Sequence, residues 1–170
     1  SSSNAYPSQN EDEEDLENDL EITRESFKGL EFQLITEVLY TIIWRIVDKR
    51  ISMEPDFQRS KKVWKDEMMS RLIESILLGI PLPSFYFNVE DSDNWIVIDG
   101  LQRLSTIEKF VVYADDQHEE YANRLKLKCL KVLKDLEGLD YNELPSRMKR
   151  ALSEFRVNVY AIRYKDQKAI

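Results

Sequence analysis

The sequence predicts an α/β domain, with an α+β arrangement as the alternative, in which helices flank a small mixed β-sheet. Three observations support this fold class. Apolar residues recur every three or four positions in several stretches, as on the buried face of a helix. Short runs of β-branched and aromatic residues lie between those stretches and are typical of strands. Glycine and proline separate several of these segments, where they interrupt regular structure.

The first expected elements are a helix, a short extended segment and a second helix. Residues 33–48 have helical apolar spacing, which predicts a helix with one buried face. Residues 51–57 include a proline and predict a short strand, and helical spacing returns over residues 65–78. Gly79 and Pro81 are expected to end the second helix.

A hairpin and a third helix are expected next. Residues 84–89 and 95–99 are rich in β-branched and aromatic side chains, and a five-residue polar loop joins them. This pattern predicts two buried strands in a hairpin. Residues 101–113 return to helical spacing and predict a helix directly after the second strand.

The last expected elements are a strand, a helix and a strand. Over residues 125–131 apolar residues alternate with Lys126 and Lys128, which predicts a half-exposed strand with both lysines on the solvent side and Cys129 on the inner side. Pro145 is expected to open a helix that runs through Leu152. Residues 155–162 predict the final strand.

The net charge of −8 is concentrated at the amino terminus. Residues 1–26 hold nine of the 32 acidic residues but one of the 24 basic residues, so the rest of the chain is balanced in charge. Their low apolar content predicts a disordered acidic tail. Residues 27–170 are long enough for a single domain, which we interpret as a fragment of a longer protein. A balanced body leaves room for a local basic face.

The cysteine and histidine content excludes several classes of site. Cys129 is the one cysteine, so no internal disulfide can form, and no stretch has the pattern of a signal peptide or the length to span a bilayer. These features predict a cytoplasmic protein without a membrane partner. His118 is the one histidine, so a zinc site built from several histidines or cysteines is excluded and a metal would need carboxylates.

The most informative segment joins the strand at residues 95–99 to the helix at residues 101–113 through Gly100. The first N–H groups of a helix lack partners and its dipole favours negative charge, while a glycine lets a phosphate approach the main chain. This junction therefore predicts an anion site that suits a phosphate group.

Three side chains beside Gly100 are the candidate catalytic residues. Arg103 can add a bidentate contact to a phosphate. Asp99 can hold a divalent metal such as Mg²⁺ on phosphate oxygens or orient a water, and Gln102 can bond the same oxygens or position the nucleophile. The structural alternative is that Asp99 caps the helix and Arg103 is a surface residue.

A second candidate segment precedes the helix at residues 65–78. Gln58 and Arg59 offer planar amide and guanidinium donors that suit phosphates or base edges. Trp64 and Phe57 are more often core residues than stacking platforms. The lysines nearby are candidates for DNA binding, although a solvated surface explains them equally well; they are Lys61, Lys62 and Lys65.

Several motifs together resemble a known family. The segments at residues 55–59, 71–83 and 98–107, with Trp64 between the first two, closely resemble the amino-terminal domain family of GmrSD restriction endonucleases over residues 33–165. That family is similar to the ParB and sulfiredoxin superfamily, in which a Gly-x-x-Arg turn at a helix start holds nucleotide phosphates. The family often has glutamine at the position of Leu101, so we expect Leu101 to pack instead.

The resemblance implies a module of modification-dependent restriction or anti-phage systems that binds or hydrolyses nucleoside triphosphates and couples this to DNA cleavage. It carries over Asp99, Gly100, Gln102 and Arg103, with Gln58 and Arg59 as the second motif, as phosphate-handling residues. It also implies DNA as a partner of the full-length protein, and a further helical portion or His-Asn-His nuclease domain beyond residue 170. A nucleoside triphosphate bound here would bring Mg²⁺, which Asp99 is placed to hold.

Two other functions stay open at this point. The domain could itself be a ParB-like metal-dependent nuclease, with Glu54, Asp56 and Asp99 as metal carboxylates. It could also be a non-catalytic DNA-binding or protein-docking module that uses the basic region between Arg45 and Arg71. Release of phosphate from a nucleoside triphosphate distinguishes a domain that hydrolyses nucleotides from the non-catalytic module. Nicking of plasmid DNA by the isolated chain is specific to the nuclease.

Overall fold

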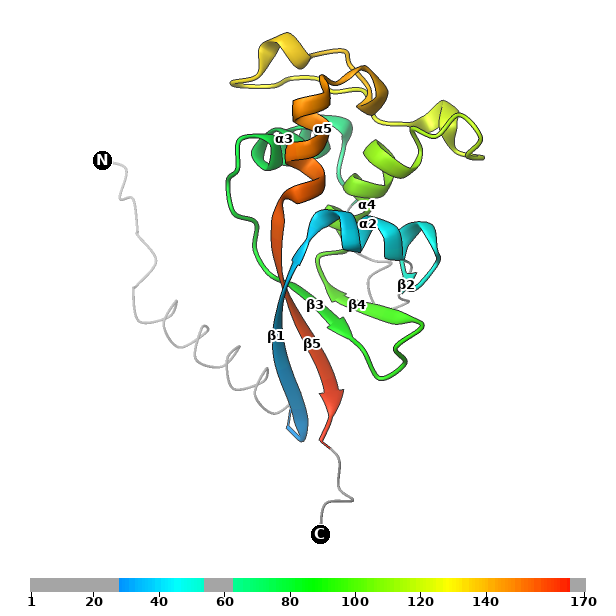
Figure 1. Ribbon diagram of the computed structural model, residues 1–170, viewed down its shortest axis with the longest axis vertical. Helices are drawn as coiled ribbons and strands as arrows, with labels where there is room; N and C mark the ends of the chain where they lie inside the picture. Colours follow the sequence, from blue (N-terminus) through cyan, green and yellow to red (C-terminus); the bar gives the residue numbers. More distant parts are fainter. Residues whose placement is uncertain (1–27, 54–62, 166–170) are drawn as a thin grey trace, which may run out of the picture. The chain divides into compact units, whose positions relative to one another are not determined.

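The computed structural model describes residues 28–53 and 63–165 (Figure 1). The acidic tail at residues 1–26 lies outside the described residues. The same is true of the candidate carboxylates Glu54 and Asp56, and of Gln58, Arg59, Lys61 and Lys62. Their assigned roles stay predictions.

The chain divides into two compact units. The larger one, Phe32–Arg163, contains every described helix and most of the sheet. The smaller one combines the residues up to Glu31 with Tyr164–Ile170, and in its described part the N–H of Lys165 donates to the carbonyl of Gly29 at 3.1 Å. The candidate site belongs to the larger unit.

A five-stranded mixed sheet confirms the predicted fold class. The strands are β1 (Leu30–Val38), β2 (Ile51–Ser52), β3 (Phe85–Asn88), β4 (Trp95–Asp99) and β5 (Arg156–Tyr164), in the order β1-β5-β3-β4-β2. β3 and β4 form the predicted antiparallel hairpin, whereas β2 pairs with β4 and β3 pairs with β5 in parallel. The order places the hairpin at the centre of the sheet.

Helices bury one side of this sheet. They are α2 (Leu39–Val47), α3 (Asp66–Leu77), α4 (Leu101–Ile107), which continues as a π-helix over Glu108–Val112, and α5 (Ser146–Glu154). α2 packs on α5 and on the π-helix, and α3 packs on α4 and α5. The strand side chains that alternate toward the core are fully or almost fully buried, among them Phe85, Phe87, Val97, Val159 and Ala161. The opposite side chains of the strands are more exposed.

The predicted helix at residues 33–48 is wrong in its first part. β1 runs to Val38, and the helix begins at Leu39, whose N–H donates to the carbonyl of Phe155 at 2.7 Å. The apolar residues before Leu39 fit both a helical and an alternating pattern, and Leu34, expected in the core, is 55% exposed. Pairing with β5 decides the conformation of this segment, and a single-sequence pattern does not contain that information.

The predicted strand at residues 125–131 does not form. The alternation itself is right, because Leu125 and Leu127 are buried and Lys126 and Lys128 are exposed. However, the main chain of Leu127 bonds to Leu139 and Gly138, in an irregular loop rather than in the sheet. Cys129 was expected to face inward, but it is exposed and has a φ of 55°, which takes it out of an extended conformation.

A buried carboxylate on α3 anchors this loop. Glu74 is 5% exposed and accepts hydrogen bonds from the N–H groups of Lys131, Val132 and Leu133 at 2.9–3.1 Å. Burial would raise the pKa of Glu74, but these three donors outweigh it and hold the pKa below its usual value. The folded state therefore binds the Glu74 proton more weakly than the unfolded chain does.

We expect Glu74→Gln to lower the free energy of unfolding at pH 7 by about 1–3 kcal/mol, because it removes a charged acceptor from buried donors. Because the pKa of Glu74 is lower in the folded state, its carboxylate stabilises the folded protein at pH values above the unfolded-state pKa of about 4.3. This stabilisation is lost as the pH falls through the folded-state pKa. Urea unfolding of the two proteins should therefore converge as the pH falls below about 4. A constant difference at all pH values, or a loss no larger than that of the exposed Glu154→Gln, would refute this role.

Candidate functional site

The predicted strand–glycine–helix junction is present. β4 ends at Asp99, Gly100 adopts a φ of 108°, and α4 begins at Leu101. The carbonyl of Gly100 accepts the first helical bond, from the N–H of Leu104 at 3.0 Å. A Cβ at position 100 would lie 2.5 Å from Cδ1 of Phe85, which is closer than atoms can approach. Both the backbone conformation and the space therefore require glycine here.

Arg103 is buried beneath this turn rather than on the surface. It is 9% exposed, and its guanidinium lies over the ring of Phe85 with Cζ 4.5 Å from the ring centroid. Nη1 donates to the carbonyl of Pro83, and Nη2 donates to the carbonyl of Ser84 at 3.4 Å. The expected fork around a phosphate is thus directed at main-chain carbonyls, and the guanidinium fixes the chain that enters β3 against the turn.

Asp99 is the exposed acid of the turn. Its side chain is 59% exposed, and its Oδ2 lies 3.8 Å from Nη2 of Arg103. Burial lowers the pKa of Arg103, and the carboxylate of Asp99 acts in the opposite direction. The N-cap residue of α4 is Gly100, so Asp99 does not occupy the cap position. The site therefore combines a buried positive charge with a carboxylate that solvent reaches.

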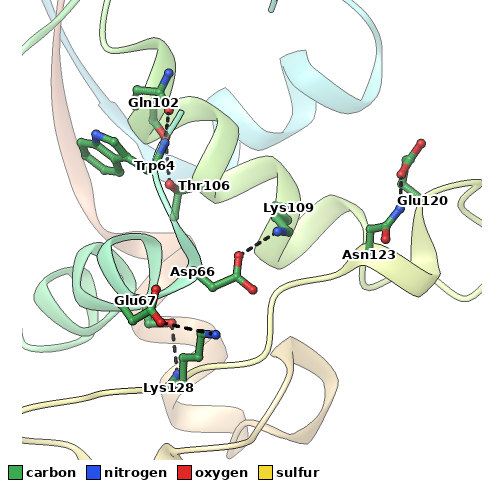
Figure 2. A network of polar contacts seen from close by, with 10 residues as sticks. Trp64, Asp66, Glu67, Gln102, Thr106, Lys109, Glu120, Asn123 and Lys128 are labelled. Atoms are coloured by element: carbon green, nitrogen blue, oxygen red, sulfur yellow. Dashed lines mark hydrogen bonds and ion pairs between the residues drawn. The ribbon is translucent and has the colours of Figure 1, made fainter. Parts of the chain in front are cut away.

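Gln102 links α4 to the chain that enters α3, as Figure 2 shows. Its Oε1 accepts a hydrogen bond from the N–H of Trp64 at 3.0 Å, while its main-chain carbonyl accepts from the hydroxyl of Thr106 at 2.8 Å. In the π-helix that follows α4, Nζ of Lys109 pairs with Oδ1 of Asp66 at 2.9 Å. No hydrogen bond from the side-chain nitrogen of Gln102 is present among the described residues.

The other residues that the sequence suggested for binding do not gather into one site among the described residues. Lys65 is exposed at the N-cap of α3, and its role in DNA binding stays a prediction. Arg45 lies over the ring of Trp95, and Arg50 pairs with Asp48 and Asp93, so two members of the basic region are engaged within the domain. Leu101 packs against the core as expected. Within residues 28–53 and 63–165, no three or more acids, histidines or cysteines are grouped to hold a metal.

The sequence did not reveal which residues contact the guanidinium of Arg103 under the turn. Pro83, Ser84 and Phe85 provide the carbonyls and the ring that Arg103 contacts. They follow Gly79 and Pro81 in the chain, which marked the end of α3 but gave no indication of what the next residues contact. Pairing of β3 with β4 brings them to Arg103.

The fold and the turn define a class: a small mixed α/β domain with a strand–glycine–helix turn at the end of a central strand. A family model for the N-terminal domain of the GmrSD restriction endonuclease matches residues 43–169, and the chain belongs to this family. The searches of curated proteins and of solved structures found no match. Within the part of the chain that the structure describes, no helix has the length and apolar character needed to cross a membrane.

Proposed function

We propose that this chain is the nucleoside-triphosphate-binding domain of a cytoplasmic restriction or anti-phage defence protein that acts on modified DNA. The proposed phosphate site is the turn between β4 and α4. The observation that carries this proposal is the left-handed Gly100, which starts a helix directly at the end of a strand and beside an exposed carboxylate. Membership of the restriction endonuclease family supports the DNA-directed part of the proposal.

In this account the main chain and Gln102 contact the phosphates. The first N–H groups of α4 lack helical partners and favour an anion, and Nε2 of Gln102 offers a further donor. Arg103 contributes its charge from beneath the turn while its hydrogen bonds stay on Pro83 and Ser84. It therefore acts on the phosphates through its electrostatic field and through the shape it gives the turn.

Asp99 fits the way in which Mg²⁺ binds together with nucleotides. Such an ion takes one or two protein carboxylates and completes its shell with phosphate oxygens and waters, so a full cage of protein ligands is not needed. Mg²⁺ would neutralise charge on the phosphates. The carboxylate of Asp99 is exposed enough to reach an ion, while Arg103 at 3.8 Å limits the repulsion between Asp99 and the phosphates.

We expect Asp99→Asn to weaken binding of ATP in the presence of Mg²⁺ by about tenfold or more, because the carboxylate ligand is lost. Without Mg²⁺ and with EDTA the sign reverses, and the variant binds ATP as well as or better than the wild type, because one negative charge near the phosphates is gone. Isothermal titration calorimetry under both conditions measures the two values.

Asp93→Asn is the matched control, because Asp93 is an exposed acid at the other end of β4 and pairs with Arg50. It should leave both affinities unchanged. Equal affinity of Asp99→Asn and wild type with Mg²⁺ would rule out the proposed ion position. If the wild type bound none of ATP, GTP, CTP and UTP, the proposal would fail in favour of a DNA-docking module, and phosphate release separates an NTPase from a sensor.

A further inference from the structure

An open cavity lies where α2 packs on the π-helix that follows α4. Its volume is about 900 Å³, which is within the range of small-molecule sites. Residues of β2 and of the loop at positions 115–120 complete its walls. The proposed phosphate turn is at the start of α4, and the lining of the cavity does not include Asp99, Gly100 or Gln102. The cavity is therefore a separate candidate site.

One part of the lining is apolar. It is formed by aliphatic side chains of α2, β2 and the π-helix, namely Ile43, Ile46, Val47, Ile51, Val111 and Val112. Ile46 and Ile51 belong to the buried core, whereas Val47 is 59% exposed. An apolar surface that water reaches is stabilised when an apolar group covers it. A ligand of this cavity should therefore have an apolar body.

The π-helix gives the cavity one polar wall. Such helices are rare and frequently occur at functional sites. The N–H of Tyr113 donates to the carbonyl of Glu108 at 3.0 Å, and its hydroxyl donates to Oε1 of the same residue at 3.3 Å. Burial, with a further contribution from the carboxylate of Glu108, raises the pKa of Tyr113 to about 12. The hydroxyl of Tyr113 therefore remains a hydrogen-bond donor at neutral pH.

The charges that line the cavity are mainly negative. They come from four acids and one lysine, namely Glu108, Asp115, Glu119, Glu120 and Lys49. Nδ2 of Asn123 donates to Oε2 of Glu120 at 2.7 Å (Figure 2). Asp115 and Glu119 are exposed, and neither forms an ion pair within residues 28–53 and 63–165. This charge attracts a cation and repels an anion such as a nucleotide.

We propose that the cavity binds a small organic cation, in which an ammonium or guanidinium group is carried on an apolar body. The body covers the aliphatic side chains of α2 and the π-helix, and the charged group lies at the carboxylates of Asp115 and Glu119. Apolar burial supplies affinity, and the carboxylates select the sign of the charge. This inference is independent of the proposed nucleotide site, because the two sites differ in lining and in the charge of the ligand.

Three probes test the proposal: n-hexylammonium, hexanoate and 1-hexanol, which share a linear alkyl chain and differ in charge. Amide NMR titration of the chain measures the affinity and the position of each. We expect hexylammonium to shift the N–H groups of Val111, Val112 and Glu119 and to bind about fivefold or more tightly than hexanoate, with 1-hexanol between them. Added NaCl should weaken binding of hexylammonium and leave 1-hexanol unchanged, because salt screens exposed charges.

Two variants change the charge of the wall. Asp115→Asn combined with Glu119→Gln should weaken binding of hexylammonium by about fivefold or more and leave 1-hexanol within about twofold, because shape is kept and charge is lost. Glu119→Lys should raise the affinity for hexanoate. Asp135→Asn is the matched control, because Asp135 is an exposed acid that does not line the cavity. It should leave all three affinities unchanged.

Several results would overturn the proposal. They are equal affinity for hexylammonium and hexanoate, shifts outside the cavity lining, and a double variant that binds hexylammonium as well as the wild type does. A lysine-containing peptide that bound in the cavity where hexylammonium did not would assign the surface to a protein partner and also overturn it. Failure of all four nucleotides to bind would instead overturn the proposed function, and binding of hexylammonium would still support the cation site.

Discussion

Gly100→Ala is expected to lower the free energy of unfolding by about 2–5 kcal/mol, the sum of two costs. An L-residue in the left-handed region costs about 1–2 kcal/mol, and an added methyl group in a filled space costs about 1–3 kcal/mol. The second cost arises here because the new Cβ would lie 2.5 Å from the buried ring of Phe85. Urea unfolding followed by circular dichroism measures the change.

Gly79→Ala separates the two costs. Gly79 also has a positive φ, of 75°, but a Cβ there would have no atom within 4 Å. This control should therefore show the backbone cost alone. If Gly100→Ala lost no more stability than Gly79→Ala, the close packing of Phe85 under the turn would be wrong. In the Gly100→Ala background, Phe85→Leu should make the combined loss smaller than the sum of the two single losses, because it relieves the contact.

Arg103→Met is expected to lower the free energy of unfolding by about 2–4 kcal/mol. Methionine keeps an apolar stem beside Phe85, but it leaves the carbonyls of Pro83 and Ser84 without their charged donor. The loss of a fixed guanidinium should also loosen the chain entering β3. Amide hydrogen exchange at Ser84 and Phe85 should therefore become faster in the variant.

Arg147→Met is the matched control, because Arg147 is an exposed residue of α5. It should change stability by less than about 0.5 kcal/mol. If Arg103→Met were as stable as this control yet lost nucleotide binding, Arg103 would be a direct phosphate ligand, as the sequence first suggested. A large loss of stability instead supports its role beneath the turn.

The strand–glycine–helix junction could be predicted from the sequence because all of its determinants are local. The β-branched run, Gly100 and the helical spacing after it lie next to one another in the chain. By contrast, the direction of the Arg103 side chain depends on the chain at Pro83 and Ser84, which β3–β4 pairing brings close. Residue type and spacing at the turn carry no information about that contact.

The dependence on contacts between distant parts of the chain also explains the other differences between the predicted and the observed structure. The pairing of Tyr86 with Tyr160 on β5 and with Asp99 on β4 depends on strand order and on an irregularity in the register between Tyr86 and Phe87, and neither follows from alternation. The loop around Leu127 has the alternation of a strand, but its hydrogen bonds go to Leu139 and Gly138. Burial patterns can therefore be read correctly while the partners that define a strand are missed.

The most direct test of the central claim is an amide NMR titration of the chain with inorganic triphosphate and Mg²⁺. We expect the largest shifts at the N–H groups of Gly100, Leu101 and Gln102, because they line the turn, and smaller shifts at Trp64, which bonds to Gln102. Shifts confined to other surfaces, or no shifts at any concentration, would contradict a phosphate site between β4 and α4.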